Sequence, residues 1–254
     1  MSSLAPALAA PPERRHERVW YALLALAAVA SLWGMAKLDW ALVWRVSPFL
    51  WKGLGVSFAM TGISIGAGLP LGILLAAGRM SRWAALRWPS VALIESVRAT
   101  PQIMVIFWIY FSYPAVTGEQ MSSWSGCAAA LTLISGAYLA EVVRGGLLSI
   151  PSVQAESAEV MGLGRLATFI FVLLPQACRN MLPAFITTIV MMFKTSSLVY
   201  VIGVVDLFRA VILINNREFA PYTLYTVMAL VYFLCCFAMS SLIRRLDPKY
   251  TLTS

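Results

Sequence analysis

Residues 150–175, IPSVQAESAEVMGLGRLATFIFVLLP, are the stretch that decides the fold, because they place a bounded, mostly polar helix in the longest loop of an apolar chain. Pro151 suits the first turn of a helix, where its missing N–H costs little. Residues 152–161 supply about three turns, and Gly162 is placed to end them. The sequence therefore predicts a short helix with defined ends inside the loop at residues 144–182, a feature typical of a docking element.

The segments around this loop are long and apolar. Hydrophobic residues make up 60% of the 254 and charged residues only 12%, whereas soluble domains carry about 25% charged residues. A helix that crosses a bilayer needs roughly 20 mostly apolar residues. Six stretches meet this requirement: residues 20–36, 53–78, 90–113, 124–143, 183–205 and 221–243. The sequence therefore predicts an all-α, multi-pass membrane protein.

The distribution of Lys and Arg predicts the orientation of these spans. With both termini in the cytoplasm, the cytoplasmic segments hold twelve of these cations and the opposite side holds five, as expected for cytoplasmic loops. The net charge of +8 is then explained by contact with anionic lipid headgroups, with no need for nucleic acid. The first apolar stretch continues to the bulky Trp33, so we expect a retained span rather than a cleaved signal peptide.

Residues that could carry enzymatic chemistry are scarce. His16, the only histidine, lies in the N-terminal tail. Four cysteines, Cys127, Cys178, Cys235 and Cys236, lack the spacing of metal ligands or of a disulfide framework. No Gly-x-x-x-x-Gly-Lys-Ser/Thr phosphate loop is present. The sequence therefore predicts that the chain is not an enzyme and binds no metal or cofactor itself.

The loop carries a motif that resembles a known family. Glu156-Ser157-Ala158, followed by Gly162 and by Leu173-Leu174-Pro175, resembles the Glu-Ala-Ala-x-x-x-Gly motif of membrane subunits of bacterial binding-protein-dependent ABC importers. Three further segments resemble the polar amino acid permease branch. They are YLAEVVRGG at residues 138–146, VRATP at residues 97–101, with Ala99 where that branch has Gly, and FKTSSL at residues 193–198.

The resemblance implies a type I ABC importer-like transmembrane domain with a five-helix core. That domain would occupy residues 53–246 and include a cytoplasmic coupling loop at residues 144–182. Residues 19–52 would add an N-terminal span and an outer loop, making six spans, between a disordered tail at residues 1–18 and a second cytoplasmic tail at residues 247–254. The implied location is the bacterial inner membrane.

The resemblance also implies partners. Two permease subunits, identical or similar, would rest on a dimer of ATP-binding subunits, which would bind ATP and Mg²⁺, and would receive an amino acid from a periplasmic substrate-binding protein. The residues implied to couple to the ATPase are Gln154, Glu156, Ser157, Ala158 and Gly162. Glu156 would make a polar contact, Ala158 would allow close approach and Gly162 would set the exit of the chain. The alternative is a solvated amphipathic helix that tethers two spans.

Charges inside a bilayer cost about 2.5–3.5 kcal/mol or more, so each predicts a function or a partner. Glu95 and Arg98 are three residues apart and can form a neutralised pair on one helix face. Alternatively, Arg98 meets a substrate carboxylate. Lys194 falls near the middle of a span and could pair with Glu95, with Glu141 or with the substrate carboxylate.

The hydroxyl groups beside Lys194 also leave two roles open. Thr195, Ser196 and Ser197 could bind an ammonium group of the substrate, or their small side chains could simply allow close helix packing. Cations near the pathway favour acidic amino acids as substrates, and residues 195–209 resemble the corresponding stretch of acidic-amino-acid permeases. However, Lys194 belongs to a segment common to the whole branch, so it does not discriminate among substrates by itself.

The predicted function is therefore that of a permease subunit which moves polar amino acids by alternating access. One alternative is a secondary transporter or channel for small polar solutes, which would depend on an ion gradient and would leave the motif at residues 156–175 unexplained. An intramembrane enzyme lacks facing catalytic groups. A structural scaffold would tolerate changes at Lys194 or Glu156.

Overall fold

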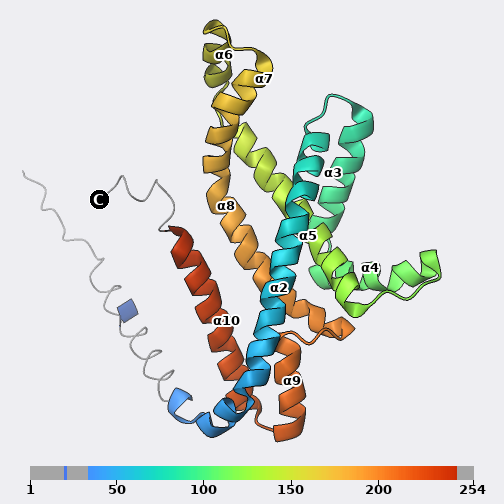
Figure 1. The fold of residues 1–254 in the computed structure, drawn as a ribbon, viewed down its shortest axis with the longest axis vertical. Coiled ribbons are helices and arrows are strands. Elements are labelled where there is room, and N and C mark those ends of the chain that lie inside the picture. The colour runs from blue at the N-terminus through green and yellow to red at the C-terminus, as the bar shows by residue number, and fades with distance from the viewer. Residues whose placement is uncertain (1–19, 22–33, 245–254) are drawn as a thin grey trace, which may run out of the picture. The chain divides into compact units, whose positions relative to one another are not determined.

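The computed structural model describes residues 20–21 and 34–244, in which all regular secondary structure is helical and there is no strand (Figure 1). The predicted all-α class is confirmed. The two predicted tails, residues 1–18 and 247–254, lie outside the described residues, as does most of the predicted first span at residues 20–36. The chain divides into two compact units, residues 1–44 and 45–254.

The described part of the first unit leads into the longest helix. Helix α2 spans Trp40–Arg79, and the carboxylate of Asp39 accepts a hydrogen bond from the backbone N–H of Leu42 at 2.9 Å, as helix-capping residues do. The predicted outer loop at residues 37–52 is therefore largely helical. Hydropathy reports where the hydrocarbon ends, but helical hydrogen bonding does not stop at that boundary, so the helix begins before the apolar run.

The predicted continuous span at residues 90–113 is wrong. The structure has two helices there, α3 (Ala84–Ala99) and α4 (Gln102–Thr117), bent by 114°. Thr100 between them is extended, with φ −90° and ψ 139°. A residue before proline is pushed out of the helical region by the ring, and Pro101 has no N–H to donate. This dipeptide therefore breaks the span.

Helix α5 (Ser123–Leu148) lies at the centre of the second unit and packs against α3, α4 and α8. Leu131, Ile134 and Leu139 on α5 are completely buried. Helix α2 also approaches α5 closely: a Cβ at Gly72 would lie 2.9 Å from the Cβ of Leu139. One face of this part of α2, which includes Gly68 and Gly72, therefore packs closely against α5, where small residues allow the backbones to approach.

The chain after α5 runs out to one end of the second unit and back. It comprises α6 (Ser152–Val160), α7 (Arg165–Ala167), a π-helical segment (Thr168–Leu173), α8 (Leu174–Thr195) and a 3₁₀ segment (Ser196–Ile202). Helices α9 (Leu207–Glu218) and α10 (Pro221–Arg244) follow. Figure 1 shows α6 and α7 at one end of this unit and α9 at the other. The fifth predicted span, expected from residue 183, belongs to a helical run that already begins at Arg165.

Among the described residues, four helices are long and apolar enough to cross a membrane, and five if the bent pair α3–α4 counts as one span. That number fits the predicted five-helix core. The sixth span and the cytoplasmic position of both termini remain predictions.

Candidate functional site

Helix α6 has a well-defined end that agrees with the predicted short helix. Gly162 has a positive φ of 81°, which glycine adopts without steric cost. Its N–H donates to the carbonyl of Glu159 at 3.0 Å, and the N–H of Leu163 donates to the carbonyl of Ala158 at 3.0 Å. These two bonds form a Schellman motif, which satisfies the last carbonyls of the helix. The turn after α6 is therefore a specific structure rather than a flexible linker.

The loop is also tied to the helices at its base. Asn180 of α8 donates to the Ser149 hydroxyl at 2.8 Å, just after α5 ends. Gln176 of α8 donates to the Val172 carbonyl at 2.9 Å and lies 3.4 Å from the side-chain oxygen of Gln154. The Gln154–Gln176 contact thus connects α6 to α8, and the Asn180–Ser149 bond connects α8 to the end of α5.

The predicted ATPase-coupling residues divide into two groups. Gln154, Glu156, Ser157 and Gly162 are exposed on the loop. Ala158 is completely buried, because it faces the rest of the loop, where α6 packs against the π-helical segment. Its small side chain therefore allows close packing within the loop rather than at an outer surface.

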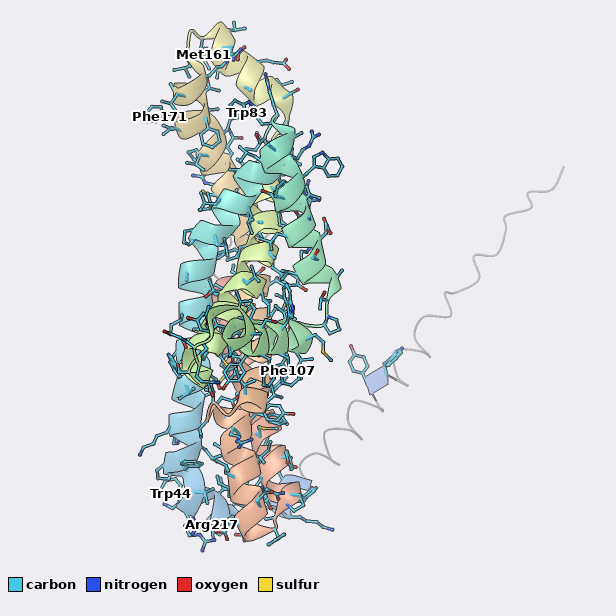
Figure 2. The ribbon with its side chains drawn as sticks, turned by 90° about the vertical axis from the view of Figure 1, so that its right-hand side faces the viewer. Trp44, Trp83, Phe107, Met161, Phe171 and Arg217 are labelled. Atoms are coloured by element: carbon cyan, nitrogen blue, oxygen red, sulfur yellow. The ribbon has the colours of Figure 1, made fainter. Side chains whose placement is uncertain are left out.

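Sequence reasoning missed an apolar surface at the tip of the loop. Val160 is 88% exposed, and Met161, Leu166 and Phe171 are each 73% exposed. Figure 2 shows Met161 and Phe171 at the same end of the second unit. Large apolar side chains exposed together on a surface loop are typical of a protein-binding surface. The sequence feature that could have predicted this surface is the apolar pair Val160-Met161, just before Gly162.

Three of the proposed pathway residues belong to an ion-pair network at the ends of α2, α3 and α5. Glu141 lies 2.9 Å from Arg144, 3.3 Å from Arg79 and 3.8 Å from Arg98. Glu95 lies 2.6 Å from Arg79 and 4.0 Å from Arg98. The predicted Glu95–Arg98 pair is therefore present within a larger cluster, which includes two arginines, Arg79 and Arg144, that the sequence did not single out.

Lys194 is separate from this network. Within the part of the chain that the structure describes, no carboxylate lies within ion-pair distance of it, so the predicted alternatives of pairing with Glu95 or Glu141 do not occur. Its side chain lines a cavity of about 340 Å³ together with Ser197, Phe208, Met228, Tyr232, Phe233 and Cys236. An exposed ammonium group at the edge of a mostly apolar cavity is suited to an anionic ligand group.

The hydroxyl groups next to Lys194 have different environments. Thr195 is buried and donates to the side-chain oxygen of Gln102 at 2.7 Å. This bond ties α8 to the start of α4, next to the break at Pro101. Ser196 is completely buried and donates to the Phe193 carbonyl at 2.8 Å. Of the three hydroxyl residues, only Ser197 lines the cavity.

No group of three or more His, Cys, Asp or Glu residues in the described segments could hold a metal ion.

Comparisons with known proteins identify the family of the chain. The family described as "Binding-protein-dependent transport system inner membrane component" matches residues 68–252. The chain belongs to this family. It is therefore the membrane component of a binding-protein-dependent transport system, as the motif at residues 156–175 predicted.

Relatives within this family carry informative names. The chain is 36% identical over 214 residues to the inner membrane amino-acid ABC transporter permease protein YhdY of Escherichia coli K12. The aligned region covers 81% of this chain and 58% of YhdY. The chain therefore spans less than two thirds of YhdY. It is 30% identical to the glutamine transport system permease protein GlnP of the same organism, over 83% of this chain and 97% of GlnP.

A solved structure resembles the whole described bundle. The crystal structure of an amino acid ABC transporter with histidines superposes with a TM-score of 0.78 at 26% sequence identity. The match covers 84% of this chain and 99% of that one. The type I importer-like architecture predicted for residues 53–246 is consistent with this similarity.

Proposed function

We propose that the chain is the transmembrane permease subunit of an ATP-driven importer of polar amino acids in the bacterial inner membrane. The observation that carries the proposal is the capped helix α6 with its exposed apolar tip, held at one end of the second unit on a chain of this family. The names of YhdY and GlnP support amino acids as the cargo. No relative described above supports the alternative of a secondary transporter or channel.

The proposed partners follow from the same loop. A dimer of ATP-binding subunits would bind Val160, Met161 and the exposed Glu156, and would supply the free energy by hydrolysing ATP with Mg²⁺. A second permease, identical or similar, would complete the pathway, and a periplasmic binding protein would deliver the substrate.

The proposed mechanism is rigid-body motion of the helices around a central site, which is the usual form of alternating access. Closure of the ATPase dimer would move α6. The contact between Gln154 and Gln176 would pass that movement to α8, and the hydrogen bond from Asn180 to Ser149 would pass it on to the end of α5. The ion pairs of Glu141 would carry it from α5 to α2 and α3. The cluster of Glu95, Arg98 and Glu141 is thus proposed to transmit motion rather than to bind substrate.

The proposed substrate contact is the cavity at Lys194. The Lys194 ammonium would bind the carboxylate that every amino acid carries, and the Ser197 and Tyr232 hydroxyls would accept or donate hydrogen bonds. Thr195 and Ser196 would support this wall of the cavity from behind. A single cation in the described lining suits the carboxylate of any amino acid. If the second permease adds its own lysine, amino acids with acidic side chains would bind more tightly than others.

The proposal is tested by purifying the full chain with the proteins that accompany it in its native membrane and measuring uptake in vesicles. We expect an ATPase to co-purify and uptake to require ATP. Lys194→Met should lower amino acid uptake at least tenfold while leaving recovery of the ATPase unchanged. The matched control is Lys52→Met, which removes an exposed cation away from the cavity. Uptake driven by an ion gradient without any ATPase would contradict the proposal.

A further inference from the structure

A second cavity, of about 470 Å³, lies at the end of the second unit opposite α6, between the beginning of α2 and the end of α9. Helix α2 contributes Arg45 and Phe49, and α9 contributes Leu213, Arg217 and Glu218. Figure 2 shows Arg217 at the end opposite Met161. In the predicted orientation this is the outer face of the membrane. The transport mechanism proposed above does not use this cavity.

The charges that line the cavity are unevenly satisfied. Arg45 donates to the Glu218 carboxylate at 2.6 Å, so these two charges largely neutralise each other. Arg217 is exposed, and no carboxylate of the described residues lies within ion-pair distance of it. The cavity therefore presents one uncompensated guanidinium group, which binds phosphate particularly well because its N–H donors match two oxygens at once.

The rest of the lining is apolar, and in the predicted orientation it lies toward the outer headgroups. Phe49 is 40% exposed and Leu213 is 39% exposed, so a small soluble anion would leave this wall in contact with water. Exposed aromatic side chains are close in sequence to the lining: Trp51 follows Phe49 on α2, and Phe219 and Tyr222 follow the end of α9. Trp and Tyr are enriched at membrane interfaces.

We propose that this cavity binds a phospholipid of the outer leaflet, with the headgroup phosphate on Arg217 and the first part of the acyl chains against Phe49 and Leu213. The combination of one free cation, an apolar wall and exposed aromatic residues close by in sequence matches a ligand that is anionic at one end and apolar at the other. The Arg45–Glu218 pair closes one side of the site and limits its charge.

The test is native mass spectrometry of the full chain, delipidated in detergent and titrated with short-chain phosphatidylglycerol. We expect Arg217→Gln to weaken lipid binding about tenfold, the loss of one charge-assisted interaction. Lys52→Gln, which removes an exposed cation that does not line the cavity, should change it less than about twofold. Glu218→Gln should strengthen binding, because it releases Arg45 from its carboxylate.

Three results would overturn the proposal. Equal lipid binding by the wild type and Arg217→Gln would show that Arg217 does not bind the lipid phosphate. Displacement of the lipid by inorganic phosphate would show a site for free anions, and displacement by free glutamate would show a site for soluble substrate. If Arg217→Gln did not fold, the opposite expected effect of Glu218→Gln would still decide the question, because unchanged or weaker binding by that variant contradicts the site.

Discussion

Glu141 makes more ion pairs than any other carboxylate of the described residues, with Arg79, Arg98 and Arg144 all within 4.0 Å. Its side chain is only 17% exposed, so the three guanidinium groups would repel one another without it. We expect Glu141→Gln to lower the free energy of unfolding by about 1–3 kcal/mol, measured by thermal unfolding of the purified protein. Glu95→Gln is the control: Glu95 is 50% exposed, and its loss should cost about 0–1 kcal/mol.

Asp206 makes stability depend on pH. It precedes α9, outside the membrane-spanning helices, and is completely buried. One carboxylate oxygen accepts from the Arg209 N–H at 2.9 Å, while the other is buried with no partner among the described residues. Burial raises the pKa of Asp206 from 3.8 to about 6. Because folding favours the protonated form of this carboxyl, the contribution of Asp206 to stability is fully present below about pH 4 and is lost as the pH rises through 6.

We therefore expect the protein to be roughly 1–3 kcal/mol less stable at pH 8 than at pH 5 from this residue. Asp206→Asn keeps the helix cap, since Asn caps as well as Asp, and should remove this part of the dependence. The measurement is the melting temperature of both proteins across this range. A slope that persists in Asp206→Asn would assign the pH dependence to other groups.

At the scale of elements, the contact between α2 and α5 depends on glycine. A Cβ at Gly72 would lie 3.0 Å from the backbone N of Ala140 as well as close to Leu139, and the backbone cannot easily move. Gly72→Val should therefore destabilise the bundle by about 1–3 kcal/mol through overpacking. Gly62→Val, on the same helix with nothing within 4 Å, is the matched control and should be close to neutral. Equal losses in the two variants would point to backbone propensity instead of packing.

The break between α3 and α4 shows how an element boundary depends on local chemistry. Hydropathy over residues 90–113 predicted one span, because the residues before and after Thr100 together form a run that is long and apolar enough to cross a membrane. The Thr100-Pro101 dipeptide interrupts this run, but the resulting bend of 114° depends on where α4 can pack. It packs against α5, and Gln102 at its start accepts from Thr195.

At the scale of the whole molecule, the proposed docking and lipid-binding surfaces lie at opposite ends of the second unit. Val160→Asp places a charge on the exposed tip of the coupling loop and should reduce recovery of a co-purified ATPase at least tenfold, because a charge would be buried in the interface. Val116 on α4 is similarly exposed, 84% against 88% for Val160. Val116→Asp should leave ATPase recovery unchanged, and loss of the ATPase in both variants would contradict docking at α6.

The sequence by itself determined the membrane class, the family and the bounded helix at residues 152–160. These follow from local properties: long apolar runs, the Glu156-to-Pro175 motif, and a glycine at position 162 that the chain needs for its left-handed turn. Composition and short-range spacing are sufficient for such features, because each is decided within a few turns of one segment.

Only the tertiary structure decided which distant side chains meet. It joined Glu141 to Arg79 and Arg98 rather than to Lys194, turned Ala158 into the loop, and placed Arg217 beside Phe49. Burial and ion pairing depend on how helices far apart in the sequence approach each other, and that approach is set by packing of small and large side chains across the interface. A single sequence does not specify those distances. The sequence therefore predicted which residues could belong to the site, but not which of them contact each other.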